Sequence, residues 1–439
     1  MERLTLVQPR HVYAPQQGNG HIHLSAPLVT AAARMIDSGV DPSAITMVDE
    51  NFGDAPTGEI EADVVGINLV GAPYIPVAIK MISDRVRSGA RVLLGGQIID
   101  SLSIEEFEQL FCSIRPDVEV VNGNEEIARY SPEEEVSSIP VWDLIPDEQM
   151  REYLSHEFSF YLSQGCKYGC RSCQAKKGRK EKYRNMEVMR EDLEYLILRA
   201  KSLGLLEFKM YLSNLDMLQN EEKIMEFGKI VGQLRKKHDF HINFRGLAGI
   251  ESYYFSHLYT IMCLRDVGLT SIAYGIDGNP SVWNSILKNQ NQGNEGGYKR
   301  CESAIAGTSQ MGVTPEILMV FGYDQDTRES LQEACDFVTD MTEKYGAVPR
   351  PHVAKTIIPG ADAWKAPENR EIVSHLLENP ERFKDLDYLA LASDVTHEDE
   401  LGVLVNEFAT KVAELMGGDP WGELVLPSSP EMNVGKYDR

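Results

Sequence analysis

The chain has 439 residues, of which 43% are hydrophobic and 25% are charged; these are ordinary values for a globular protein. At roughly 150 residues per domain, the length predicts two to three domains. The 43 basic and 67 acidic residues give a net charge of −24, which argues against nucleic acid as a partner because phosphate binding needs a basic surface. Seven cysteines, an odd number in a long chain, do not suggest a secreted disulfide scaffold. With no signal peptide after Met1 and no uncharged run long enough for a bilayer, we expect a cytoplasmic protein without a membrane partner.

Residues 1–128 alternate short apolar segments with helical patterns. Strands are expected at Leu4–Val7, Ala44–Val48, Val64–Val70, Arg91–Leu94 and Val118–Val121, and helices at Pro27–Ser38, Ile75–Arg87 and Ile104–Phe111. Strands separated by helices imply right-handed βαβ units, and uninterrupted apolar strands fit a parallel sheet covered on both faces. The segment is therefore predicted to be an α/β, doubly wound, Rossmann-like domain. Its ligands should lie beyond the carboxyl ends of the strands.

Residues 129–155 are polar and proline-marked and are predicted to be a linker, in which Val141-Trp142 is an apolar anchor for the next domain. Residues 156–365 repeat a strand-and-helix pattern that predicts part of a (β/α)6 barrel. The six expected strands are Phe158–Leu162, Phe208–Leu212, Phe240–Phe244, Ser271–Gly275, Glu316–Phe321 and Val353–Ile358. The tail, residues 366–439, is predicted to be a small, mostly helical C-terminal cap.

One motif stands out. Cys166, Cys170 and Cys173 form a C-x3-C-x2-C array directly after the first expected strand of the second domain. Three closely spaced thiolates suit an iron–sulfur cluster or zinc. Zinc needs a fourth ligand, and the nearest upstream histidine is His156. Three ligands with one vacant position fit a cluster that binds a substrate at one iron, while a structural zinc knuckle is the alternative.

On this array and its position the second domain resembles the radical SAM superfamily. The resemblance implies that the three cysteines hold a [4Fe-4S] cluster whose open iron chelates S-adenosylmethionine, and that its cleavage yields a 5′-deoxyadenosyl radical. The family often has an aromatic residue just before the third cysteine, where this chain has Ser172, so Tyr168 is the candidate for that role. Further S-adenosylmethionine contacts are implied at the ends of the following strands, at Ser213, Asn214, Asp216, Arg245, Asp277, Phe321 and Gly322. For each of these, turn chemistry or a surface ion pair is the alternative.

A doubly wound domain before such a barrel resembles the cobalamin-binding domain of cobalamin-dependent radical SAM enzymes. The implied cobalamin contacts lie at the carboxyl ends of its strands, at Pro9, Gly71, Ala72, Gly95, Gly96, Gln97, Gly123 and Asn124. The Asp-x-His-x-x-Gly motif of other cobalamin proteins is absent, and His21 and His23 do not match it. A cobalamin-like domain that binds no cofactor is the alternative.

The resemblance implies a cobalamin-dependent methyltransferase that acts on an unactivated carbon of a natural product or peptide. A flavodoxin- or ferredoxin-like protein would be its reductant. One alternative is a radical SAM enzyme that does not methylate, such as a cyclase, a rearrangement or excision enzyme, or a peptide epimerase. An epimerase needs a thiol hydrogen donor, for which Cys301 and Cys335 are the candidates; as small apolar residues they would otherwise simply pack in the core. An iron–sulfur electron carrier or scaffold is the other alternative.

A basic run follows the cysteine array in this acidic chain. Its members are Lys176, Lys177, Arg179, Lys180, Lys182 and Arg184. A run of like charges is usually a solvated loop. The functional interpretation is attraction of an anionic substrate, a peptide or an electron donor.

Overall fold

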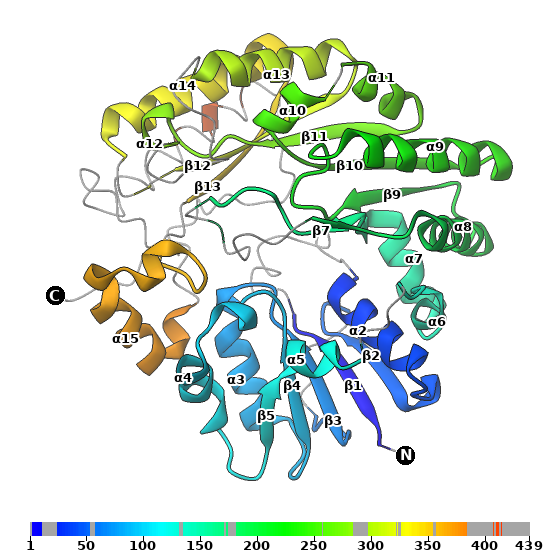
Figure 1. Ribbon diagram of the computed structural model, residues 1–439, viewed down its shortest axis with the longest axis vertical. Helices are drawn as coiled ribbons and strands as arrows, with labels where there is room; N and C mark the ends of the chain where they lie inside the picture. The colour runs from blue at the N-terminus through cyan, green and yellow to red at the C-terminus, as the bar shows by residue number, and fades with distance from the viewer. Residues whose placement is uncertain are drawn as a thin grey trace.

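The structure is a computed structural model that describes residues 2–10, 24–52, 58–130, 135–170, 173, 181–256, 258–283, 297–321, 323, 326–353, 357–383, 407, 410, 411 and 414. Two all-parallel sheets dominate it, one from each half of the chain (Figure 1). A short antiparallel pair, β7 (Ser163–Gln164) with β8 (Lys182–Tyr183), forms a third sheet. Within these residues no helix is long and apolar enough to cross a membrane.

The first sheet has five strands in the order β2-β1-β3-β4-β5. They are β1 (Leu4–Gln8), β2 (Ile45–Asp49), β3 (Val64–Asn68), β4 (Arg91–Gly95) and β5 (Glu119–Asn122). The helices of this region are α2 (Ala26–Asp37), α3 (Ile75–Asp84), α4 (Ile104–Phe107) with a π-helical turn at Glu108–Cys112, and α5 (Gly123–Ala128). Every strand begins and ends within two residues of its predicted position, so the parallel sheet is confirmed.

Helices cover both faces of the first sheet. The apolar side of α2, which includes Leu28 and Ala32, packs on one face in a cluster with Leu6. The apolar side of α3, which includes Ile75 and Met81, packs on the other face. Because β2 and β3 lie on opposite sides of β1, the strand order reverses between β1 and β3. Ligands of doubly wound sheets bind at such a point.

The second sheet has six strands in sequential order, β6-β9-β10-β11-β12-β13. They are β6 (Phe158–Phe160), β9 (Glu207–Leu212), β10 (His241–Gly249), β11 (Leu269–Gly275), β12 (Thr314–Phe321) and β13 (Val348–Val353). The helices of this region are α8 (Met186–Ser202), α9 (Glu221–His238), α10 (Ile250–Phe255), α11 (Leu258–Asp266), α12 (Pro280–Trp283), α13 (Tyr298–Gln310) and α14 (Arg328–Tyr345).

Two predicted strand positions in this sheet are wrong. The sixth strand occupies Val348–Val353 and not Val353–Ile358. Its two prolines, Pro349 and Pro351, argue against a strand in the sequence, but β13 is the edge strand, which needs ladder hydrogen bonds on one side only. The third strand continues five residues past Phe244 to Gly249. Gly246 does not mark a turn: a Cβ there would lie 2.7 Å from Met217 Sδ, so its small size serves packing.

The predicted linker is partly helical. It contains α6 (Ile139–Trp142) and α7 (Asp147–His156). The Trp142 side chain is buried and contacts the rings of Phe158 and Tyr195, at centroid distances of 5.7 and 5.9 Å. The predicted apolar anchor on the following region is confirmed.

The chain returns to the first sheet after β13. Residues 357–383 contain a 3₁₀ helix at Asp362–Lys365 and α15 (Arg370–Glu378). Their buried side chains, which include Trp364 and Leu376, share a hydrophobic cluster with Phe111 of the π-helical turn. Trp364 Nε1 also donates a 2.8 Å hydrogen bond to Glu106 Oε1 of α4, and Figure 1 shows α15 beside α4. This part of the tail therefore extends the core of the first domain.

Candidate functional site

The cysteine array lies at the carboxyl edge of the second sheet. Cys166 comes shortly after β6 and two residues after β7 (Ser163–Gln164). The loop that starts there returns to β8 (Lys182–Tyr183), which pairs with β7. Residues 165–181, here called the cysteine loop, are thus closed at their base by the two strands. Of the array, Cys166, Cys170 and Cys173 are described and half-buried.

The thiols fit a metal cluster by number and kind. Burial raises the pKa of Cys166 to about 11, and the negative charges of Cys170 and Cys173 contribute to this shift. The loop thus gathers three soft ligands whose deprotonation a bound cluster would favour. Within the described residues no group of three or more His, Cys, Asp or Glu side chains is placed so that it could hold a metal ion. Residues 171–172 and 174–180 of the same loop lie outside those residues.

Asn214, a predicted S-adenosylmethionine contact, braces the start of the cysteine loop. Its side chain is buried, its Oδ1 accepts a 3.0 Å hydrogen bond from Leu162 N, and its Nδ2 donates to Ser163 Oγ at 2.8 Å. Ser163 Oγ in turn donates to Glu181 Oε1 at the end of the loop. The amide thus joins the end of β9 to the chain that leads to Cys166. The neighbouring Ser213 is half-buried, and its backbone nitrogen bonds Phe160 O.

A hydrogen-bonded chain of three side chains underlies the array. The Tyr168 hydroxyl lies 3.3 Å from Ser252 Oγ, and Ser252 Oγ donates to Asp216 Oδ2 at 2.6 Å. Asp216 is 2% exposed, and burial raises its pKa to about 6. Two of the predicted contacts, Tyr168 and Asp216, are therefore brought together. Ser252 was missed because it lies in α10, beyond the predicted end of the third strand.

A second residue missed by the sequence analysis also holds the loop. Gln219 Oε1 accepts a 3.2 Å hydrogen bond from Lys167 N, and its Nε2 donates to Gly165 O at 3.4 Å. Its side-chain amide therefore pairs with backbone on both sides of Cys166. No feature of the local sequence distinguishes this glutamine from a surface residue.

Arg245 does not lie at the end of its strand as predicted, because β10 continues to Gly249. Its Nε and Nη2 donate to the Glu157 carboxylate at 2.6 and 2.8 Å. Its guanidinium also lies over the Tyr211 ring, 4.9 Å from the centroid. Two strands away, on β12, Glu316 lies 3.8 Å from Arg245 Nη1 and accepts from Ser271 and Arg350. Arg245 thus belongs to a row of paired polar side chains across the middle of the sheet.

The remaining candidates of this sheet lie at the ends of β11 and β12. Asp277 adopts a left-handed backbone, with φ of 49°, just after β11, and its carbonyl accepts a 3.0 Å hydrogen bond from Trp283 Nε1. Such a conformation is uncommon for a residue with a side chain and marks a constrained turn. Phe321 ends β12, but its side chain and Gly322 lie outside the described structure.

The two candidate hydrogen donors are core residues. Cys301 in α13 is 1% exposed and Cys335 in α14 is 5% exposed, and both belong to the hydrophobic cluster that covers the second sheet and continues to α2. Burial raises the pKa of Cys335 to about 12. The described structure therefore favours the packing interpretation for both thiols.

At the first sheet, the predicted cobalamin contacts lie at the carboxyl edge, and several brace one another. Asn124 Oδ1 accepts from Gly96 N at 3.1 Å, and Asn124 Nδ2 donates to Gly96 O at 2.9 Å. Gly96 has φ of 109°, and a Cβ there would lie 2.2 Å from Leu69 O. Gly123 is also tightly packed, with Leu94 O at 3.0 Å from a Cβ. Tight backbone packing explains these residues without a ligand.

The other predicted cobalamin contacts lie at the same edge. Pro9 and Ala72 are buried, Gly71 and Gly95 are half-buried, and Gln97 is exposed. Where the strand order reverses, Asn68 Nδ2 donates to Gln8 Oε1 at 3.2 Å and to Ser25 Oγ at 3.1 Å. The edge therefore has small residues, which let a bound molecule approach the backbone closely, at the position where ligands of doubly wound sheets bind.

Among solved structures, the fold is similar to those of two radical SAM enzymes. The radical S-adenosylmethionine methyltransferase TsrM from Kitasatospora setae, with cobalamin and a [4Fe-4S] cluster bound, matches with a TM-score of 0.57 and 14% identity over 80% of this chain and 75% of that chain. The cobalamin-dependent S-adenosylmethionine radical enzyme OxsB matches with a TM-score of 0.56 and 14% identity over 93% of this chain and 61% of that chain. No family model and no curated protein matches the chain.

Proposed function

We propose that this protein is a radical SAM enzyme that binds a [4Fe-4S] cluster, S-adenosylmethionine and cobalamin. We propose further that it methylates an unactivated carbon of a natural-product or peptide substrate. The observation that carries the proposal is the C-x3-C-x2-C array at the carboxyl edge of β6, in a chain whose other sheet is doubly wound. The similarity of fold to TsrM supports the proposal. TsrM has also been solved with its tryptophan substrate and an S-adenosylmethionine analogue bound.

In this proposal residues 1–128, together with residues 357–383 that pack on them, form the cobalamin domain. The second sheet, from β6 to β13, with its helices is a partial (β/α)6 barrel. Cys166, Cys170 and Cys173 would ligate three irons of the cluster. When bound, the cluster and S-adenosylmethionine would supply a carbon-based radical and cobalamin would supply the methyl group.

The protein's own contribution is placement. The chain Tyr168–Ser252–Asp216 and the amides of Asn214 and Gln219 hold the cysteine loop against the ends of β9 and β10. Ser213 and Asp277, with Phe321 and Gly322, stay candidates for S-adenosylmethionine contact at the same edge. Arg245 is a weaker candidate, because its guanidinium already forms a bidentate ion pair with the Glu157 carboxylate.

The partners follow from the chemistry. We propose a small-molecule or peptide substrate, a flavodoxin- or ferredoxin-like reductant and a cytoplasmic location. The deciding experiment is anaerobic purification followed by iron, sulfide and corrin analysis, and then incubation with S-adenosylmethionine and dithionite. We expect about four irons per chain, bound corrin, and 5′-deoxyadenosine as product. Protein that takes up iron but never cleaves S-adenosylmethionine would contradict the radical SAM assignment.

The non-methylating alternative gives a different result in the same experiment. Iron uptake and S-adenosylmethionine cleavage without corrin binding would favour a cyclase, rearrangement or excision enzyme, or an epimerase. The buried positions of Cys301 and Cys335 do not favour the epimerase. An electron carrier would show iron alone, with neither corrin nor cleavage.

A further inference from the structure

Arg184, the last residue of the basic run, is not solvated. Its side chain is 3% exposed, while the predicted default for this run is a solvated loop. Lys182 precedes it in β8, and residues 176–180 lie outside the described structure. Arg184 N donates to Leu162 O at 3.0 Å, one residue before β7 begins. The residue therefore sits where the cysteine loop is closed.

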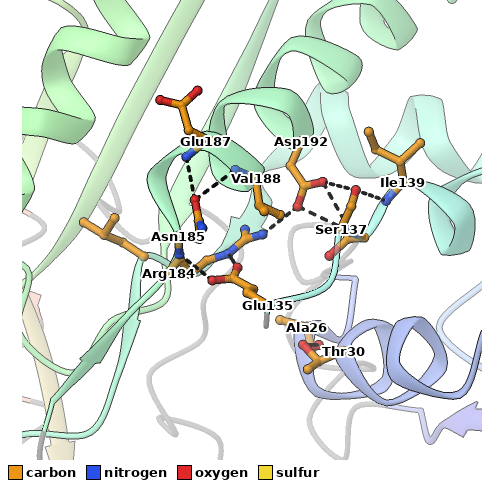
Figure 2. Close-up of polar contacts among 12 residues, drawn as sticks. Ala26, Thr30, Glu135, Ser137, Ile139, Arg184, Asn185, Glu187, Val188 and Asp192 are labelled. Atoms are coloured by element: carbon orange, nitrogen blue, oxygen red, sulfur yellow. Dashed lines mark hydrogen bonds and ion pairs between the residues drawn. The ribbon is translucent and has the colours of Figure 1, made fainter. Parts of the chain in front are cut away.

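Two carboxylates from different parts of the chain neutralise the guanidinium (Figure 2). Its Nη2 donates to Asp192 Oδ2 at 2.6 Å and its Nε to Glu135 Oε1, and Asp192 is fully buried. Asp192 lies in α8, whereas Glu135 lies in the segment between the two sheets. Asp192 Oδ1 also accepts from Ser137 Oγ at 2.6 Å and from Ser138 N at 3.2 Å. The network thus ties the return of the cysteine loop to residues 135–138.

The flat side of the guanidinium extends the network toward the first sheet. Arg184 Cζ lies 4.7 Å from the centroid of the Tyr161 ring and 5.2 Å from that of Phe160. Tyr161 and Thr30 of α2 line the same small cavity as Arg184, and Figure 2 shows Thr30 below Glu135. A planar fork that pairs two carboxylates and stacks on aromatic faces is specific to arginine, because lysine offers only a compact point charge.

We propose that Arg184 is a positioning residue that fixes the cysteine loop relative to the segment between the sheets and to α2 of the first domain. The effect of Arg184 on cluster binding rests on the proposed function, since in that proposal the cysteine loop carries the cluster. R184K keeps the positive charge but loses the planar fork and the ring stacking, and E135Q removes one of the two ion pairs, so either change should let the closure open locally. The loop carries Lys167, Arg171, Lys176, Lys177, Arg179 and Lys180, so trypsin reports its opening directly.

The test compares R184K and E135Q with R190K, which changes a more exposed arginine of α8, the helix that carries Asp192. In the metal-free full chain, we expect tryptic cleavage within the loop, relative to cleavage elsewhere, to rise about tenfold in R184K and to rise in E135Q. In R190K this ratio should match wild type. An unchanged ratio in both network variants, or an equal rise in R190K, would overturn the inference.

Iron uptake gives the second readout. After anaerobic reconstitution, we expect R184K to hold less than half the iron of wild type although all three cysteines are present, with R190K unchanged. Full iron loading with an unaltered electron paramagnetic resonance spectrum in R184K would also overturn the role of Arg184. If wild type takes up no iron, the proposed function fails, and the cleavage ratio still decides whether Arg184 positions the loop.

Discussion

The Tyr153 hydroxyl donates a 2.6 Å hydrogen bond to Asp49 Oδ2. This bond joins α7, which precedes the second sheet, to the end of β2 in the first. The Tyr153 side chain is buried and also contacts the Phe52 ring edge-on, at a centroid distance of 5.2 Å. Because Y153F keeps the ring but removes the donor from a largely buried carboxylate, we expect it to lower the free energy of unfolding by about 1–3 kcal/mol.

Urea unfolding followed by circular dichroism measures this change. The matched control is Y195F, which removes an exposed hydrogen bond to Asp143. Its cost should be below about 1 kcal/mol. Equal costs for the two variants would show that the bond to Asp49 adds nothing beyond an exposed contact.

The same carboxyl makes stability depend on pH. Burial raises the pKa of Asp49, although hydrogen bonds from Tyr153 and Asn51 oppose the shift. A carboxyl whose pKa is higher in the folded state binds its proton more tightly in the folded protein. Its contribution to the free energy of unfolding is therefore fully present below the pKa of the unfolded state. That contribution is lost as the pH rises through the pKa of the folded state. We expect D49N to flatten the fall in unfolding free energy above about pH 4. The exposed D37N should leave the wild-type slope intact, and parallel curves for D49N and wild type would refute the assignment.

The cysteine array should be necessary for the proposed cluster. We expect C166S to lose most of the iron and sulfide of the reconstituted protein, because oxygen replaces one of the three proposed protein ligands. The control is C112S, which changes an exposed cysteine of the first domain. Chemical iron and sulfide analysis with the absorption spectrum measures both. Full iron content in C166S would remove this residue from the site.

Gly96 should be intolerant of a side chain. In G96A the new Cβ would meet Leu69 O at 2.2 Å, and φ of 109° is strained for any L-residue. In the control G89A the backbone is also left-handed, with φ of 75°, but nothing lies within 4 Å of the Cβ. Both variants should lose stability, and G96A should lose more by at least about 1 kcal/mol because of the clash. Thermal unfolding measures the difference, and equal losses would mean that the turn relaxes around the methyl group.

Trp364 should anchor the returning segment to the first domain. W364F keeps an aromatic ring but removes the bond to Glu106 and leaves space beside Phe383, whose ring centroid lies 6.1 Å away. We expect a loss of about 1–3 kcal/mol in unfolding free energy and faster proteolysis after residue 357. The control W283F changes a tryptophan of the second domain and should not accelerate that cleavage. Unchanged proteolysis in W364F would show that other side chains hold the segment.

The sequence by itself determined the periodic elements and the metal-ligand motif. Alternation of apolar strands with helices predicted both parallel sheets. Such patterns can be recognised in the sequence because the spacing of apolar residues within each segment determines which of its faces is buried. The spacing of Cys166, Cys170 and Cys173 identified the loop for the same reason: ligands on one short loop are close in sequence and in space.

Only the tertiary structure decided which polar residues meet. Ser252 reaches Asp216, and Arg184 reaches Glu135, across 36 and 49 positions of the chain. Asn124 proved to clamp Gly96, and Trp364 to pack on the first domain. The position of a polar side chain in the sequence does not indicate its partner. A buried polar residue that pairs with a distant side chain therefore cannot be distinguished from a polar residue of a surface turn by sequence alone. Burial and pairing then separate Arg184 from the exposed Lys182 of the same basic run, because a charge held between two carboxylates and beside an aromatic ring differs from a solvated one.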